Sequence, residues 1–291
     1  MEIPKFKVSQ TLIKEYQNFC ETVRNYHDKG SKQSYERFSK YKHTCGKLFK
    51  ARYIDKSIEF VPSEAMKLGI YFEYLCTGAI PKNGIHPEPV KNTKTGTLST
   101  AYQTVTESAM FFKKILAKYK IKLLKVNYYL SDDDKSGILD ILAEWNKKKV
   151  IIDLKYSGFI DNKWDELGWD TDTLHNKHNL MIQGVHYKVL AKDILGIDDI
   201  PFYYFIFNSA NPTDAKIILQ RVDPDEVLRH RQQIKDVKDQ IIKLLHNPNG
   251  FKALPEYKSC QACPLYISCE ERQEVPEVVE VHYRGRFEEN L

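Results

Sequence analysis

A charged hairpin at residues 137–155 limits the possible folds of this chain more than any other stretch. It reads GILDILAEWNKKKVIIDLK, two runs rich in Ile, Leu and Val around a polar turn. This pattern predicts two antiparallel strands joined by a tight turn. Buried strands are normally apolar, so Asp140, Asp153 and Lys155 are the first candidates for chemistry.

The position of the turn decides which side chains lie opposite each other. A turn centred between Asn146 and Lys147 pairs Asp140 with Asp153, at a Cβ separation of ~5 Å. Two carboxylates this close repel each other unless a cation lies between them, and a divalent ion with oxygen ligands fills that role. Side chains alternate along a strand, so Asp153 and Lys155 share one face. The turn lacks glycine, so a slightly shifted register remains open.

The glycine at 137, followed by Asp140 and by a strand that ends in Asp153-Leu154-Lys155, resembles the core motif of the PD-(D/E)XK nuclease superfamily. The resemblance implies an α/β fold class: a restriction-endonuclease-like central mixed β-sheet flanked by helices, with a helical N-terminal region and a C-terminal Cys cluster. It also implies that Asp140, Asp153 and the carbonyl of Leu154 hold Mg²⁺ or Mn²⁺. Lys155 would orient the attacking water or stabilise the transition state.

A helix predicted at residues 63–78 adds a third carboxylate to this set. Ser63 suits the start of the helix and Gly78 its end. Gly69 and Glu73 are four residues apart and therefore lie on one helical face. In the RecB-like branch of the superfamily, a His or Glu four residues after a glycine helps to hold the metal, and Glu73 matches that position. The alternative is an ordinary solvent-facing glutamate.

A second helix, predicted at residues 175–195, carries Gln183 and Tyr187 on one face. This Gln-x-x-x-Tyr resembles the motif that follows the core in the RecB-like branch, where the helix lies beside the active site and contacts the substrate or the lysine. The same region holds three histidines whose spacing fits a zinc site poorly: His175, His178 and His186.

Three cysteines crowd the segment SCQACPLYISC, which favours metal binding over disulfides in a chain without an export signal. They are Cys260, Cys263 and Cys269. A tetrahedral site needs a fourth ligand, and spacing alone does not decide between zinc and an iron–sulfur cluster. The candidates for that ligand are Cys45, Cys20, Cys76 and a histidine.

The basic, aromatic segment at residues 34–53 resembles the N-terminal segment of RecB-like nucleases that supplies the first iron–sulfur ligand, although Gly46 replaces the usual proline. One early and three late cysteines resemble the AddB-type and CRISPR-associated RecB-type exonucleases, whose termini are joined by a [4Fe–4S] cluster. The resemblance therefore implies a structural [4Fe–4S] cluster, with Zn²⁺ as the alternative, held by Cys45, Cys260, Cys263 and Cys269.

The remaining elements complete the predicted sheet. Apolar patterns predict helices at residues 11–26, 104–119 and 224–245, and strands at residues 121–130, 201–208 and 215–222. The loop at residues 156–173 contains Trp164 and Trp169, which either stack on a base or pin the loop down. We expect three segments: a helical N-terminal region with the first Cys ligand at residues 1–100, the nuclease core with the following helix at 101–245, and the Cys-cluster segment with an acidic tail at 246–291.

Charge and hydropathy restrict the partners. The net charge is +5, but residues 270–291 hold seven Glu against three Arg, so the rest of the chain is more basic than the total. A basic body suits a phosphate-rich partner. No apolar run approaches the ~20 residues of a membrane helix, and the first residues lack signal-peptide architecture. We expect a soluble, cytoplasmic protein without a membrane partner.

Together these patterns predict a Mg²⁺- or Mn²⁺-dependent deoxyribonuclease. The resemblance favours an exonuclease that acts on DNA ends or single strands in DNA repair or recombination, with a helicase or recombination protein as a further partner. Two alternatives stay open: a non-catalytic nucleic-acid-binding subunit of a helicase–nuclease or recombination complex, and a zinc-binding interaction protein.

Overall fold

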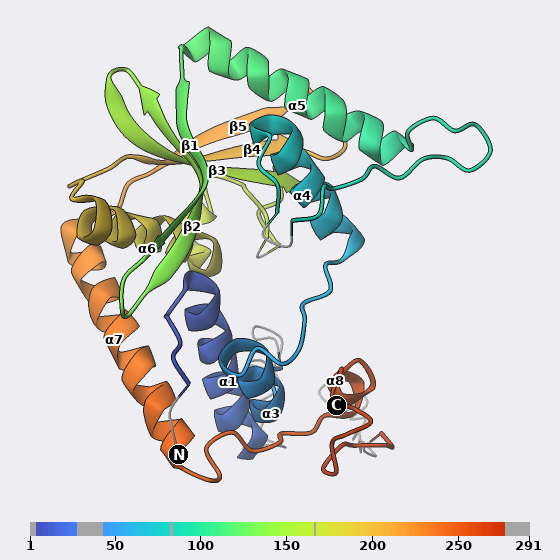
Figure 1. Ribbon diagram of the computed structural model, residues 1–291, viewed down its shortest axis with the longest axis vertical. Helices are drawn as coiled ribbons and strands as arrows, with labels where there is room; N and C mark the ends of the chain where they lie inside the picture. Colours follow the sequence, from blue (N-terminus) through green and yellow to red (C-terminus); the bar gives the residue numbers. More distant parts are fainter. Residues whose placement is uncertain (1–3, 28–42, 82–83, 166, 277–291) are drawn as a thin grey trace, which may run out of the picture. The chain divides into compact units, whose positions relative to one another are not determined.

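The computed structural model describes residues 4–27, 43–81, 84–165 and 167–276 (Figure 1). The chain divides into two compact units, each formed by two separate stretches. The first consists of Met1–Lys14 and Phe60–Ile242, and the second consists of Glu15–Glu59 and Lys243–Leu291. Every residue proposed for catalysis lies in the first unit, and all four proposed cluster cysteines lie in the second.

The first unit is built on a five-stranded mixed sheet in the order β1-β2-β3-β4-β5. Neighbouring strands are antiparallel except β3 and β4, which are parallel. A parallel pair needs a crossover, and α6 (His178–Leu195) supplies it between these two strands. The strands are β1 (Lys122–Ser131), β2 (Ser136–Trp145), β3 (Lys148–Ser157), β4 (Phe202–Asn208) and β5 (Ala215–Gln220).

The β2–β3 hairpin has the register predicted from its turn. Asn146 and Lys147 adopt φ values of 51° and 62°, the left-handed conformation that a two-residue hairpin turn of the primed type requires at both positions. Paired residues run from Trp145↔Lys148 to Ile141↔Ile152. The turn therefore forms without glycine and the register does not shift.

Two helices, α4 (Glu64–Thr77) and α5 (Thr100–Tyr119), cover one face of the sheet (Figure 1). The boundaries of α4 are those predicted: the Ser63 side chain accepts a hydrogen bond from the Met66 N–H at 3.3 Å, and Gly78 closes the helix at φ 72°. Their buried face is strongly aromatic because the helices and the sheet both contribute rings, among them Phe72, Phe112, Phe205 and Phe207.

The opposite face of the sheet is covered by α6, with α7 (Pro224–His246) behind it. A short turn, η2 (Leu174–Asn176), precedes α6, so this helix begins three residues later than predicted. A Cβ on Gly137 would lie only 2.6 Å from Leu190 Cδ1. The glycine therefore allows α6 to pack close to β2.

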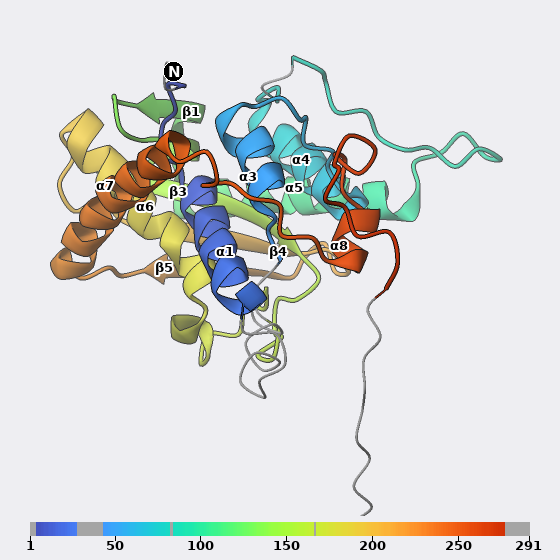
Figure 2. The ribbon, with the colours of Figure 1, turned by 90° about the horizontal axis from the view of Figure 1, so that it is seen from below.

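The second unit contains most of α1 (Gln10–His27), then α3 (Gly46–Phe49), the π-helical turn η1 (Lys50–Ile54) and α8 (Tyr257–Gln261) (Figure 2). Its core is an aromatic stack in which the Phe49 ring lies 5.5 Å from Phe19 and 5.8 Å from Phe251. A Cβ on Gly46 would lie 2.4 Å from the Lys252 carbonyl oxygen, so close backbone packing explains a glycine after Cys45.

The part of the predicted basic segment before His43 and the acidic tail from residue 277 onward lie outside the described residues. None of the helices in the described ranges has the length and apolar character needed to cross a membrane.

Candidate functional site

Six side chains named from the sequence come from four elements of the first unit: Glu73 from α4, Asp140 from β2, Asp153 and Lys155 from β3, and Gln183 and Tyr187 from α6. The two helices cover opposite faces of the sheet. A network of contacts and charges joins all six of these side chains where the β2–β3 ladder ends.

Asp140 lies where the two strands of the hairpin stop pairing. The last paired residues are Ile141 and Ile152. Immediately beyond them, Asp140 Oδ2 accepts the backbone N–H of Leu154 at 2.8 Å. A side-chain carboxylate thus takes the place of a backbone acceptor, which keeps the Asp140 carboxylate against β3 next to Asp153.

Asp153 is completely buried, and each of its carboxylate oxygens has a different environment. Oδ1 accepts a hydrogen bond from Gln183 Nε2 at 2.5 Å. Oδ2 forms an ion pair with Lys155 Nζ. A buried carboxylate oxygen keeps a further lone pair after one such contact, so it can also serve as a ligand for a metal cation.

Burial and mutual repulsion make these carboxyl groups hard to ionise together. Burial, followed by the charge of Asp153, raises the pKa of Glu73 to about 7, against the opposing effect of Lys155. Burial, with the charges of Asp153 and Glu73, raises the pKa of Asp140 well above its usual range. Burial also raises the pKa of Asp153, although Lys155 opposes it. One lysine does not balance three carboxylates, so the site favours an additional cation.

The charge of Lys155 is held in place by the same carboxylates. Burial acts to lower the pKa of this ammonium group, but the nearby Asp153 and Asp140 outweigh it and raise the pKa. The side chain keeps 29% of its surface exposed. Lys155 is therefore a protonated cation that faces both the carboxylates and the solvent, where a phosphate could reach it.

On α6, Gln183 and Tyr187 form a unit, because Gln183 Nε2 also donates to the Tyr187 hydroxyl at 3.1 Å. Burial, with the charges of Asp140 and Asp153, raises the pKa of Tyr187 well above its usual range, which keeps the phenol neutral. The Tyr187 ring in turn lies against Gly137, where a Cβ would approach within 3.1 Å. Gln183 and Tyr187 thus hold Asp153 in position.

Oxygen donors of this kind suit Mg²⁺ or Mn²⁺, so the residues fit the expected metal. The side chains do not form a finished coordination sphere: within the described ranges, no three His, Cys, Asp or Glu side chains are grouped closely enough to hold a metal ion. Asp140 and Asp153 direct their oxygens toward the Leu154 N–H, Gln183 and Lys155.

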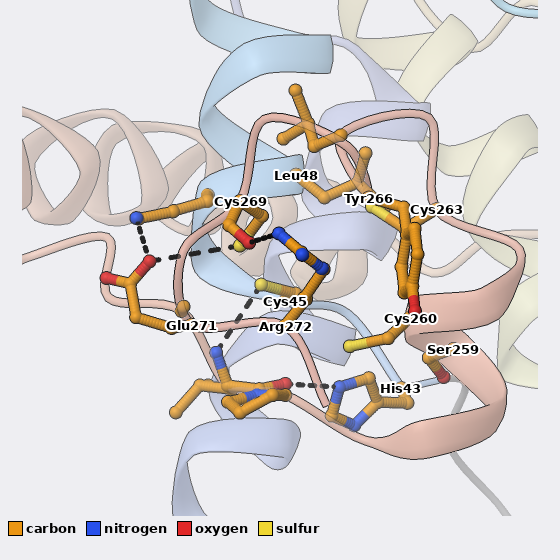
Figure 3. A pocket seen from close by; sticks show the side chains of 15 residues that line it. His43, Cys45, Leu48, Ser259, Cys260, Cys263, Tyr266, Cys269, Glu271 and Arg272 are labelled. Carbon is orange, nitrogen blue, oxygen red and sulfur yellow. Dashed lines mark hydrogen bonds and ion pairs between the residues drawn. The ribbon is translucent and has the colours of Figure 1, made fainter. Parts of the chain in front are cut away.

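The second unit contains a pocket lined by all four cysteines expected to hold a cluster (Figure 3). Its other lining residues include His43, Leu48, Tyr266, Glu271 and Arg272. Burial, followed by the charges of the other three cysteines, raises the pKa of Cys263, so the four sulfurs are close enough to influence one another. The two alternative thiols are elsewhere: Cys20 lies on α1 and Cys76 on α4.

Short turns arrange these cysteines around the pocket. The Cys263 N–H donates to the Cys260 carbonyl at 3.0 Å, and the Leu254 N–H lies 3.4 Å from Cys45 Sγ. All six cysteines of the chain are free thiols. Figure 3 shows the Arg272 side chain among the sulfurs, and sequence reasoning did not identify this residue. Its Nη1 donates to the Cys269 carbonyl at 3.1 Å.

The three histidines of the α6 region differ in burial. His175 and His178 are exposed, whereas His186 is fully buried. His186 Nδ1 lies 3.0 Å from His230 Nε2 on α7, and His186 Nε2 lies 3.0 Å from the Ser136 carbonyl oxygen. His230 carries no local sequence signal for this pairing, because the two residues are brought together only by the packing of α7 on α6.

The two tryptophans of the loop after β3 differ sharply in burial. Trp169 is 3% exposed and packs on Tyr204 at a ring separation of 4.9 Å, so it pins the loop. Trp164 is 86% exposed, with Lys163 Nζ 4.9 Å from its ring centroid. Trp164 therefore contributes little to the core.

No family model matches the chain, and no curated protein sequence matches it. Among solved structures, a candidate exonuclease from Eubacterium rectale aligns over 94% of this chain and 91% of its own, with a TM-score of 0.55 and 15% sequence identity. A phage-related exonuclease from Haemophilus somnus aligns over 69% of this chain and 95% of its own, with a TM-score of 0.35 and 13% identity. The Eubacterium rectale protein shares the fold along nearly the whole chain, which confirms the predicted α/β class.

Proposed function

We propose that this chain is a divalent-metal-dependent nuclease that hydrolyses phosphodiester bonds in DNA. The observation that carries the proposal is the grouping of the buried Asp153 with the half-buried Glu73, Asp140 and Lys155 at the point where the β2–β3 ladder ends. Three carboxylates with raised pKa values beside one lysine are a costly arrangement in a protein interior. A catalytic site that binds a metal ion accounts for the presence of this costly arrangement.

Asp140, Asp153 and the Leu154 carbonyl would hold Mg²⁺ or Mn²⁺, with Glu73 completing the donor set directly or through water. When bound, such an ion lowers the pKa of a coordinated water and stabilises charge on the scissile phosphate. The fit rests on the chemistry of the donors and on the complete burial of the Asp153 carboxylate, which Lys155 alone does not neutralise together with the other two carboxylates.

Lys155 supplies the protein's own positive charge to the reaction. Its ammonium group stays protonated because the neighbouring carboxylates raise its pKa, and part of the side chain is exposed. It would therefore stabilise the negative charge that develops on the phosphate. Gln183 and Tyr187 act as positioning residues, because Gln183 restrains Asp153 Oδ1 and Tyr187 restrains Gln183.

Within nucleases, we infer an exonuclease of the RecB-like type that acts on DNA ends or single strands. Two observations support this choice. Gln183 contacts the catalytic carboxylate, as the Gln-x-x-x-Tyr resemblance implies, and the chain shares the fold of a candidate exonuclease. The inference extends to work in DNA repair or recombination, with a helicase or recombination protein as partner.

We also propose that Cys45, Cys260, Cys263 and Cys269 hold a structural [4Fe–4S] cluster, with Zn²⁺ as the alternative. All four line one pocket of the second unit. Metal analysis and visible absorbance of anaerobically purified protein separate the two ions. Cys263→Ala should remove a brown colour and reduce solubility, whereas Cys20→Ala should not. A colourless, stable wild type with stoichiometric zinc would overturn the iron assignment.

The nuclease proposal is tested with end-labelled linear DNA and covalently closed circular DNA in Mg²⁺ or Mn²⁺. Wild type should degrade the linear substrate, Asp153→Asn should not, and the exposed control Asp133→Asn should match wild type. Cleavage of circles as well would reassign the protein as an endonuclease. Absence of cleavage by wild type with both metals would refute the catalytic proposal and favour a non-catalytic DNA-binding subunit.

A further inference from the structure

Six exposed lysines gather where α5 ends, β1 begins and β2 turns into β3. We call this group the lysine corner: Lys118, Lys120, Lys122, Lys147, Lys148 and Lys149. Within the described part of the chain, none of the six takes part in an ion pair. In the sequence of residues 117–122 and 143–150, Glu144 is the single acidic side chain. The corner therefore carries a concentrated positive charge.

The strand register and the aromatic contacts show that these lysines are neighbours in space. Glu144 pairs with Lys122 on β1 and with Lys149 on β3, so the two lysines flank it on one face of the sheet. Figure 1 shows α5 leading directly into β1. The Tyr119 ring at the end of α5 lies 5.6 Å from the Trp145 ring at the end of β2.

The lysine corner is also rigid. Trp145 packs on Tyr203 of β4 at 4.8 Å, which fixes the end of the hairpin to the sheet. Lys120 and Lys147 adopt left-handed φ values of 53° and 62°. Glycine or asparagine suits such positions better than lysine does, because a side chain crowds the backbone there. Lysine is therefore held at these two positions at some cost in backbone conformation.

We propose that the lysine corner binds the phosphate backbone of duplex DNA flanking the bond that is cut, an inference that rests on the proposed nuclease function. Lys149 and Asp153 lie on the same face of β3, separated by four residues, hence by ~13 Å at ~3.3 Å per residue. That separation matches about four base pairs at ~3.4 Å per step. The separation is short enough for one duplex to reach both the site and the corner.

Lysines at the edge of a sheet have a second known use, because β1 is an edge strand and charge there prevents pairing with another chain. The two roles predict different results. Edge protection predicts that loss of the lysines promotes self-association and leaves DNA binding unchanged. A DNA-binding role predicts weaker and less salt-sensitive binding by a protein of unchanged oligomeric state.

The test compares Lys147→Gln/Lys148→Gln/Lys149→Gln with a matched control, Lys91→Gln/Lys94→Gln/Lys235→Gln, whose three lysines are also exposed and form no ion pair among the described residues. Binding to a blunt 30-base-pair duplex is measured in EDTA across a salt series. The corner variant should lose about tenfold in affinity, and its slope of log K against log salt should become less negative by about 3. The control should match wild type.

Binding in EDTA does not depend on cleavage, so this proposal and the nuclease proposal can fail separately. On a DNA substrate with metal, the corner variant should show a raised KM and an unchanged kcat, because the lysines lie away from the reacting groups. An unchanged salt slope, an equal loss in the control, or failure of wild type to bind duplex in EDTA would each overturn the lysine-corner proposal. A shift to larger oligomers with unchanged binding would assign the lysines to edge protection instead.

Discussion

Acidification should destabilise the first unit through the buried pair His186 and His230. Burial, then the charge of His230, lowers the pKa of His186 to about 3. Burial lowers the pKa of His230 to about 4, against the opposing hydrogen bond to Gln233. The charged groups around the pair act in both directions: Lys135 disfavours protonation of His186, whereas Glu226 favours protonation of His230.

The sign of the effect follows from which state binds more protons. Below the ordinary histidine pKa of about 6.5 the unfolded chain takes up protons, whereas the folded pair stays neutral until the pH nears 4 and then 3. The pair's contribution to stability is therefore complete above pH ~6.5 and is lost as the pH falls. At ~1.4 kcal/mol per pH unit and per histidine, the free energy of unfolding should drop by about 4 kcal/mol between pH 7 and pH 5.

Urea unfolding in EDTA at pH 7 and pH 5 measures this drop, and variants isolate its source. The site carboxyls, whose pKa values are raised, respond in the opposite direction and partly mask the histidines in wild type. His186→Gln/His230→Gln removes the titrating pair, so its pH 7 to pH 5 drop should be smaller than that of wild type by about 4 kcal/mol. The exposed variant His175→Gln is the control. Equal drops in wild type and the buried-pair variant would refute the reasoning.

Two further substitutions, one in the loop after β3 and one where β2 meets α6, are tested by measuring the free energy of unfolding. Trp169→Ala should lose about 3 to 5 kcal/mol by removing a buried ring, and Trp164→Ala should stay within about 0.5 kcal/mol of wild type because that ring is exposed. Equal losses would contradict the loop packing. Gly137→Ala should cost about 1 to 3 kcal/mol and reduce cleavage, since its Cβ would meet Leu190 and Tyr187. In the control Gly69→Ala, a Cβ has no atom within 4 Å, and no loss is expected.

The central hairpin is the part of this fold that local sequence predicts best. Its apolar runs, its polar turn and the period of two along a strand predict both strands, their register and the juxtaposition of Asp140 with β3. Helix α4 is similarly local, because Ser63 and Gly78 mark its ends through contacts within a few residues. Interactions of this range depend on neighbouring residues alone, so pattern reasoning can find them.

Contacts between segments that are far apart in the sequence could be identified only from the tertiary structure. His186 meets His230 only because α7 packs on α6, and the Arg272 side chain lies among the cysteines because the second unit joins two separate stretches of chain. Trp164 and Trp169 also differ in burial, because the Trp169 ring packs on Tyr204. None of these outcomes leaves a periodic or spacing signal in the sequence.

The sequence by itself determined the elements, the hairpin register and the choice of residue types that can bind a divalent ion and a cluster. The tertiary structure decided how far those groups perturb one another, because burial and the approach of α4 and α6 from opposite faces set the charges around Asp153. It also decided that six lysines from α5, β1, β3 and the adjoining turns form one surface. Local patterns record the conformation of neighbouring residues, whereas electrostatic energy depends on distance and burial in the folded chain.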